Sequence, residues 1–265
     1  MTYILIYITF LSCKNIILGH VQQWIILQLF KLRKDVMLNT VLEKPMKLYD
    51  QAFLTGCDRS TEWMLSWFIK HYKKHNNSPI IFADFGVSEL TRKIVESNFH
   101  AVIDMTQIKE RGWFKKPRSM LYSPSKKTVW LDTDCQVLDD ISPIFNMLEK
   151  DRLSMVEDRP WSERRGEVWH NSGVVGFIDK PIILHQWCQE VHDNPNTGDQ
   201  EVLHSMLNPI TKLKYISDLP NEYNVMRIQI ELDNYKGSKR IIHWTGRKGK
   251  ERIKEIMDKE KNRYA

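Results

Sequence analysis

Apolar and polar residues alternate in short blocks from residue 51 onward, and the blocks predict strands and helices in turn. Short apolar runs predict strands at 51–55, 80–83, 101–104 and 128–131. Segments with helical apolar spacing lie between these runs, at 58–72, 88–97 and 116–122. Such alternation is typical of βαβ units on a mainly parallel sheet, so the predicted fold class is α/β. A crevice for a nucleotide is expected at the carboxyl ends of the strands.

The first 45 residues do not share this pattern. The apolar run at 3–12 is interrupted by polar residues and is shorter than the roughly 20 residues that a spanning helix needs. No basic residue precedes it, as one would in a signal peptide. Residues 21–32 would suit an amphipathic helix at a membrane surface. Two alternatives stay open: peripheral membrane contact through residues 1–36, or an N-terminal extension outside a single folded domain at 46–265.

Composition and charge narrow the class of protein. The 265 residues are 42% hydrophobic, which allows a buried core and excludes a disordered chain. The net charge of +6 is mild, and residues 239–265 hold ten Lys or Arg against four Asp or Glu. Glutamates alternate with these cations as on a salt-bridged helix at 251–262, which argues against nucleic acid as a partner. The four cysteines form no Cys-x-x-Cys pair, so we expect reduced thiols and a cytoplasmic location.

Two carboxylates, Asp132 and Asp134, stand where a buried apolar strand ends. Extended backbone aims side chains two residues apart to the same side. Like charges this close need a cation, so a divalent metal with oxygen ligands, Mn²⁺ or Mg²⁺, is the economical interpretation. An acidic turn is the common alternative when such a pair stands alone. An Asp-x-Asp phosphatase of the haloacid-dehalogenase type is another, although its motif normally lies on the first strand.

Further motifs accompany this pair. They are Leu138-Asp139-Asp140-Ile141, Asn171-Ser172-Gly173-Val174, Asp199-Gln200-Glu201 and His243-x-x-Gly246 with lysines after it. This order resembles the GT-A nucleotide-sugar glycosyltransferases, and within them glycosyltransferase family 8, the glycogenin and lipopolysaccharide galactosyltransferase group. The resemblance covers about residues 51–250.

The resemblance implies a GT-A (Rossmann-like) fold and a hexosyltransferase. The expected reaction moves a hexose from a nucleotide sugar, with a UDP-hexose as donor, to a hydroxyl of a carbohydrate, lipid-linked or protein acceptor. The anomeric configuration would be retained and the reaction would depend on a metal. A non-catalytic relative that binds a nucleotide sugar or carbohydrate is the alternative from another class of protein.

The metal would be held by Asp132, Asp134 and His243 in this resemblance, with Asp132 also able to hold the ribose. A packed core histidine is the ordinary alternative for His243. Cations near the glycines that follow could meet phosphate oxygens. The family usually has a lysine six residues after the histidine. That position is Gly249 here.

Other donor contacts are carried over from the family by position. The phosphate lysine is either Lys248 or Lys250, with Gly246 beside them. Thr55 and Asp58 follow the first strand, although Asp58 could equally cap a helix. The basic residue before the Asp-x-Asp strand is Arg118, with Lys116 as its competitor.

Catalytic contacts fall on two motifs. Asn171 would face the donor sugar, although Asn-Ser-Gly is also an ordinary turn. The resemblance places Asp199 and Gln200 beside the anomeric carbon, whereas an acid at a helix start is commonly a cap.

The acceptor side is expected on the polar segment 157–170, which we interpret as a loop over the site. Its candidates are Trp161, Trp169 and His170, because tryptophan faces pack against sugars. Packing of each tryptophan under its own loop is at least as ordinary an explanation.

Overall fold

The computed structural model describes residues 47–262, and the expectations for residues 1–45 concern residues outside this range. A seven-stranded sheet forms the centre, in the order β3-β2-β1-β4-β7-β6-β8. Its strands are β1 (Tyr49–Cys57), β2 (Ile80–Asp84), β3 (Ala101–Asp104), β4 (Ser125–Leu131), β6 (Leu153–Glu157), β7 (His170–Ile178) and β8 (Ile216–Asp218). Only β7 runs antiparallel to its neighbours, β4 and β6. The predicted mainly parallel α/β sheet is confirmed.

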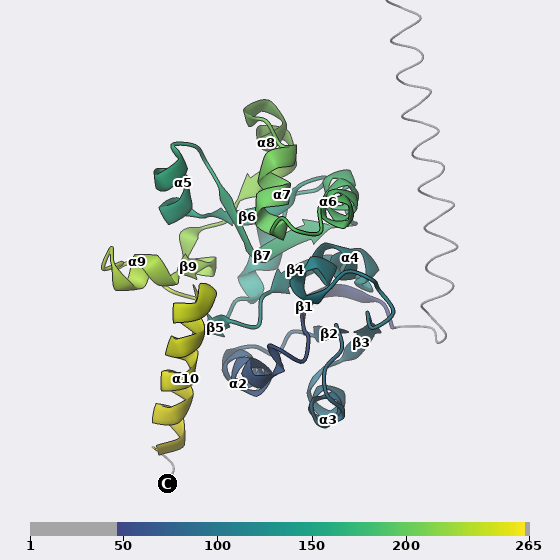
Figure 1. Ribbon diagram of the computed structural model, residues 1–265, viewed down its shortest axis with the longest axis vertical. Coiled ribbons are helices and arrows are strands. Elements are labelled where there is room, and N and C mark those ends of the chain that lie inside the picture. The colour runs from purple at the N-terminus through teal and green to yellow at the C-terminus, as the bar shows by residue number, and fades with distance from the viewer. Residues whose placement is uncertain (1–46, 263–265) are drawn as a thin grey trace, which may run out of the picture. The chain divides into compact units, whose positions relative to one another are not determined.

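Helices cover both faces of this sheet. The α-helices are α2 (Leu65–His75), α3 (Glu89–Asn98), α4 (Lys116–Tyr122), α5 (Arg159–Arg165), α6 (Ile182–Asp193), α7 (Asp199–Met206), α8 (Pro209–Tyr215), α9 (Arg227–Glu231) and α10 (Gly246–Asn262). Short 3₁₀ turns are η1 (Glu62–Met64), η2 (Gly112–Lys115), η3 (Ser142–Asn146) and η4 (Asn221–Tyr223). Figure 1 shows α2 and α3 on one side of the sheet and α4, α6 and α7 on the other. Within residues 47–262, no helix has the length and apolarity to cross a membrane.

The strand order reverses between β1 and β4. The chain runs outward through β2 and β3 and then returns to place β4 beside β1. The helices before and after such a reversal lie on opposite faces, which opens a crevice at the carboxyl ends of the strands. Because β7 is antiparallel, its first residues lie at this same edge, and the Asp132 amide donates to the Gly173 carbonyl at 2.9 Å.

A second, three-stranded sheet brings the C-terminal segment to this edge. It contains β5 (Cys135–Val137), β10 (Ile241–His243) and β9 (Val225–Met226), with β10 in the middle. Antiparallel pairing sets His243 opposite Cys135, directly after Asp134. The long sequence separation between the Asp-x-Asp motif and His243 is therefore closed by backbone pairing.

One local prediction is corrected, and one alternative interpretation is excluded. The segment predicted as a loop, 157–170, contains helix α5, because Asp158 caps its first turn and Gly166 ends it at a φ of 69°. Residues 171–173, for which a turn was the alternative interpretation, lie inside β7. A register shift beside Met155 and Val156 accompanies it in the pairing with β6.

Candidate functional site

A cavity of about 650 Å³ lies at the crevice where β1 and β4 end and β7 begins. Its wall is formed by segments that are distant in the sequence. The residues of this wall that carry chemistry are Asp58, Lys116, Asp132, Asp134, Asp158, Trp161, Arg164, Asn171, Asp199, Gln200, Glu201, Arg227, His243, Gly246 and Lys250. Most of the residues predicted from the motifs therefore share one cavity.

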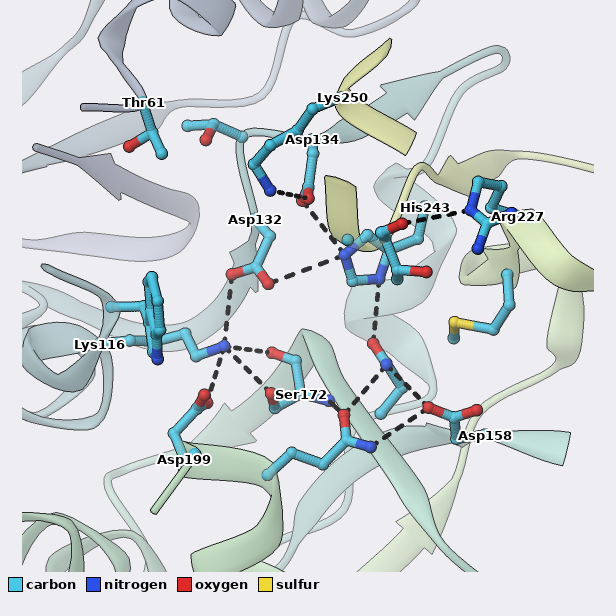
Figure 2. Close-up of a pocket in the computed structure, with 18 of the residues that line it drawn as sticks. Thr61, Lys116, Asp132, Asp134, Asp158, Ser172, Asp199, Arg227, His243 and Lys250 are labelled. Atoms are coloured by element: carbon cyan, nitrogen blue, oxygen red, sulfur yellow. Dashed lines mark hydrogen bonds and ion pairs between the residues drawn. The ribbon is translucent and has the colours of Figure 1, made fainter. Parts of the chain in front are cut away.

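The three predicted metal ligands converge in this wall (Figure 2). His243 Nε2 lies 3.1 Å from Asp134 Oδ1 and 3.8 Å from Asp132 Oδ2. The other oxygen of Asp132 accepts from Trp130 Nε1 at 2.6 Å, which fixes the carboxylate with Oδ2 toward the histidine. Two carboxylate oxygens and one imidazole nitrogen thus face a common point.

The tautomer of His243 is set from behind by Asn171. Asn171 Oδ1 is identified as the acceptor because the Gly173 amide donates to it at 2.8 Å and Asn224 Nδ2 at 3.0 Å. His243 Nδ1, 3.0 Å from the same oxygen, must therefore carry a proton. In the neutral ring Nε2 is then the lone-pair nitrogen, and it faces Asp132 and Asp134. Such a hydrogen bond is the usual support of a metal-binding histidine.

Gly173 is the residue that lets the imidazole lie this close to β7. A Cβ at this position would stand 2.1 Å from His243 Cε1 and 2.4 Å from Nδ1. Both distances are far below any tolerated contact between heavy atoms. The glycine of the Asn-Ser-Gly motif is therefore required by packing against His243.

The surroundings shift the pKa values of the two carboxylates in opposite directions. Burial raises the pKa of Asp132, and the neighbouring charge of Asp134 adds to this, although Lys116 opposes it. Burial also acts against ionisation of Asp134, but the charge and hydrogen bond of His243 and the charge of Lys250 outweigh it and lower its pKa to about 2. Burial lowers the pKa of His243, whereas Asp134 and Asp132 together outweigh burial and raise it. The site thus demands a positive charge between the two carboxylates, which a divalent cation can supply as well as a proton on His243.

Cys135 also lies close to this cluster. Ligand atoms of Asp134, Cys135 and His243 lie within 4.8 Å of one another, so these residues form a buried group able to hold a metal ion. Burial raises the pKa of the Cys135 thiol well above its usual range, and its sulfur lies 3.9 Å from the Gly173 carbonyl oxygen, to which it donates. A protonated thiol is a poor ligand, so Asp132, with its free oxygen, completes the set better.

Lys116 is the basic residue that enters the site. Its buried Nζ lies 2.8 Å from Asp199 Oδ2 and 3.4 Å from Asp132 Oδ1, and it donates to the Ser172 carbonyl and hydroxyl at 3.1 Å each (Figure 2). Arg118, which the sequence favoured, instead pairs with Glu110 at 2.6 Å and is not part of the cavity wall. Of the two candidates, Lys116 is therefore the one that lines the cavity.

Asp199 and Gln200 begin helix α7, as predicted, and both line the cavity. Gln200 Oε1 accepts from Asn171 Nδ2 at 3.0 Å and from the Ser172 amide at 3.2 Å. Asp158 Oδ2 accepts from Asn171 Nδ2 at 3.0 Å and Gln200 Nε2 at 3.2 Å. Asn171 is buried and all its polar atoms are bound to protein groups, so it positions His243 rather than presenting a free amide to the cavity.

Of the two donor-side candidates after the first strand, Asp58 lines the cavity and Thr55 does not. Asp58 lines the cavity while its Oδ1 accepts from the Ser60 amide at 2.9 Å, so it also stabilises the turn after β1. Thr55 lies inside β1, fully buried, and is not in the cavity wall, which corrects its placement after the strand.

The glycine-rich segment after His243 becomes the start of α10. Gly246 (φ 71°) and Lys250 line the cavity, with Lys250 Nζ 3.5 Å from Asp134 Oδ2, whereas Lys248 does not. Gly249 packs so closely that a Cβ would stand 1.9 Å from the Trp244 carbonyl oxygen. A lysine at this position, which is usual in the family that the motifs resemble, would therefore require α10 to shift.

Of the three acceptor-side candidates, one lines the cavity and two do not. Trp161 lines the cavity. Trp169 is buried behind it, edge-on to Trp161 at 6.0 Å and stacked on His204 at 3.4 Å. His170 Nε2 contacts Asp218 at 2.8 Å and lies outside the cavity wall. Neither Trp169 nor His170 therefore lines the cavity: Trp169 packs behind Trp161, and His170 pairs with Asp218.

Three charged residues of the wall were missed by the motifs: Asp158, Arg164 and Arg227. Asp158 had a signal, because Asp before Arg-Pro is a typical helix cap. Arg227 pairs with Glu231 four residues later on the same helix and donates to the Thr245 carbonyl at 3.2 Å, and for this second, long-range contact the sequence carries no signal.

No family model and no curated protein sequence matches the chain. Solved structures match it in fold. The galactosyltransferase LgtC, determined in complex with donor and acceptor sugar analogues, is 15% identical over 74% of this chain and 87% of LgtC, with a TM-score of 0.52. The apo form of the glycosyltransferase GlyE from Streptococcus pneumoniae TIGR4 is 18% identical over 75% of this chain and 55% of GlyE, with a TM-score of 0.56. The chain therefore has the GT-A fold that its motifs predict.

Proposed function

We propose that this protein is a metal-dependent glycosyltransferase. It moves a hexosyl group from a nucleotide sugar, with a UDP-hexose as the first donor to test, to a hydroxyl of a carbohydrate, lipid-linked or protein acceptor. The observation that carries the proposal is the convergence of Asp132, Asp134 and His243 at the nucleotide crevice of a GT-A fold. The free, buried thiols of Cys57, Cys135 and Cys188 support a cytoplasmic location.

The set of metal-ligating atoms fits the proposed metal ion. Two carboxylate oxygens and an imidazole nitrogen suit Mn²⁺ and admit Mg²⁺. Such an ion, when bound, neutralises charge on the diphosphate leaving group. Lys250, beside Asp134 at the start of α10, is placed to donate to phosphate oxygens, and Gly246 allows the backbone to approach them.

The protein's other residues orient the reactants. Lys116 holds Asp132 and Asp199 at fixed positions, and Asn171 holds the ring of His243. Asp199 and Gln200 are the groups we propose to border the anomeric carbon. Preorganised charges of this kind lower the barrier most where charge develops in the transition state.

Retention of configuration is part of this proposal. Asp158 and Asp199 are both engaged, the first by two amides and the second by Lys116, so neither is a free carboxylate for nucleophilic attack. A same-face substitution, in which the departing diphosphate accepts the acceptor's proton, needs no such group. An inverting reaction would need a carboxylate base, and the exposed Glu201 is the first to test.

The test is a donor screen. UDP-, GDP- and ADP-sugars are incubated with the protein and Mn²⁺, and nucleotide release is measured with and without a metal chelator. We expect release from at least one UDP-sugar that the chelator abolishes. Asp134→Asn should abolish release, whereas Asp151→Asn, which removes an exposed carboxylate outside the cavity, should not. Tight binding of UDP-sugars without release or transfer would instead identify a non-catalytic relative.

A further inference from the structure

Helix α5 contributes a positively charged part of the cavity wall. Arg164 lines the cavity, and both Arg164 and Arg165 are exposed. Their guanidinium carbons lie 4.9 and 5.1 Å from the ring centroid of Trp161, within cation–π distance. Stacking holds a guanidinium by its face and leaves its N–H donors at the edge available for an anion.

Arg164 differs from the other cations of the wall, and the neighbouring Arg165 shares the difference. Lys116, Lys250 and Arg227 each lie beside a carboxylate. Within residues 47–262, no carboxylate forms an ion pair with Arg164 or Arg165; both guanidinium groups lie over the ring of Trp161, and that of Arg165 also lies near Trp169. Their charge is therefore not neutralised by the protein.

The aromatic ring that supports the arginines is itself packed against other rings. Trp161 packs edge-on against the buried Trp169, with the ring planes at 85°. Trp169 in turn stacks on His204 with an interplanar angle of 12°. The carboxylate of Glu163, the residue before Arg164 on the same helix, does not neutralise this arginine, because successive residues of a helix do not face each other. A charged group held in this way loses little conformational entropy when it binds a ligand.

The position of α5 separates this charge from the donor diphosphate. Asp158, which caps α5, contacts Asn171 and Gln200 at the centre of the site. Arg164 is six residues further on, about 9 Å along the helix axis. Lys250 lies on α10, and Figure 1 shows α5 and α10 well apart. An anion bound by Arg164 thus belongs to a group beyond the reacting sugar.

We propose that the acceptor is an acidic saccharide whose carboxylate or phosphate group is bound by Arg164, with Arg165 beside it. The inference rests on the proposed function, because it assigns the acceptor of that same site. The feature that the inference specifies is an anionic group on the acceptor, and both a uronic acid and a sugar phosphate carry one.

The experiment measures binding of matched sugars to the full chain by ligand-observed NMR, with UDP and Mn²⁺ present to occupy the donor site. The probes are p-nitrophenyl β-glucuronide against p-nitrophenyl β-glucoside, and glucose 6-phosphate against glucose. We expect at least one acidic sugar to bind about tenfold more tightly than its neutral partner, as charge-assisted hydrogen bonds predict. The pair that shows the preference distinguishes carboxylate from phosphate.

Variants locate the anion. Arg164→Gln should reduce the preference to less than threefold, whereas Arg152→Gln, which removes the same charge at the far end of β6, should leave it intact. The proposal is overturned by equal or undetectable binding of acidic and neutral sugars, by a preference that survives Arg164→Gln, or by one that is lost in Lys250→Gln instead. Donor hydrolysis by the same preparation tests the proposed function separately, since it needs no acceptor.

Discussion

Gly173→Ala should disable the metal site while the fold is kept. The new Cβ would stand 2.1 Å from His243 Cε1, whereas carbon atoms in contact are separated by about 3.5 Å or more. The imidazole must therefore move by about 1.5 Å, against the roughly 0.2 Å that metal–ligand distances tolerate. His243 Nε2, which lies 3.1 Å from Asp134 Oδ1 in the wild-type protein, would move away from that carboxylate. We expect Mn²⁺ affinity to fall about 10- to 100-fold and nucleotide release by about 100-fold.

The matched control lies three residues further along the same strand. Gly176→Ala also places a Cβ in a crowded position, 2.3 Å from Leu148 Cδ2, but its neighbour is a flexible leucine far from the ligands. Both variants should lose about 1–3 kcal/mol of stability through overpacking. Thermal unfolding and Mn²⁺ titration by electron paramagnetic resonance separate the two effects. Wild-type Mn²⁺ affinity in Gly173→Ala, or an equal loss in Gly176→Ala, would refute the reasoning.

Three further predictions follow from single contacts. Asp134→Asn should abolish Mn²⁺-dependent binding of the donor, measured by calorimetry, while circular dichroism shows an unchanged fold; full activity would contradict the metal assignment. Lys116→Met leaves Asp132 and Asp199 without their shared cation and should cost about 3–5 kcal/mol of stability in urea unfolding, the usual cost of breaking a buried ion pair; a loss below about 1 kcal/mol would contradict it. Gly249→Lys restores the family's usual residue but should lower the melting temperature and donor affinity together, because its Cβ would meet the Trp244 carbonyl; a gain in donor affinity would show that α10 can move instead.

The sequence predicted the framework well because strand and helix periods are local properties. The strand at 101–104 and the helix at 116–122 have the predicted bounds. Helix α5 was missed because its polar composition outweighed the capping residue Asp158 and the helix-ending Gly166. These end signals were present and would have predicted it.

Which member of a polar run faces the cavity could not be predicted. Lys116 and Arg118 are two residues apart on α4, so their side chains point about 200° apart around the helix axis. The flanking apolar residues do not choose between the two directions, because Met120 lies one turn after Lys116 and Leu121 and Tyr122 lie one turn after Arg118. Lys248 and Lys250 pose the same problem at the start of α10, and only packing of Gly249 against Trp244 resolves it.

The role of Asn171 shows what topology adds to a motif. The sequence allowed a turn or a contact to the donor sugar, because Asn-Ser-Gly suits either. The antiparallel course of β7 places this residue at the carboxyl end of β4, and the pairing of β10 with β5 brings His243 against it. The side-chain amide of Asn171 can then take only one orientation, because the Gly173 N–H must face its oxygen and not its nitrogen. A backbone hydrogen bond on β7 thus decides which nitrogen of a histidine on β10 faces the carboxylates after β4.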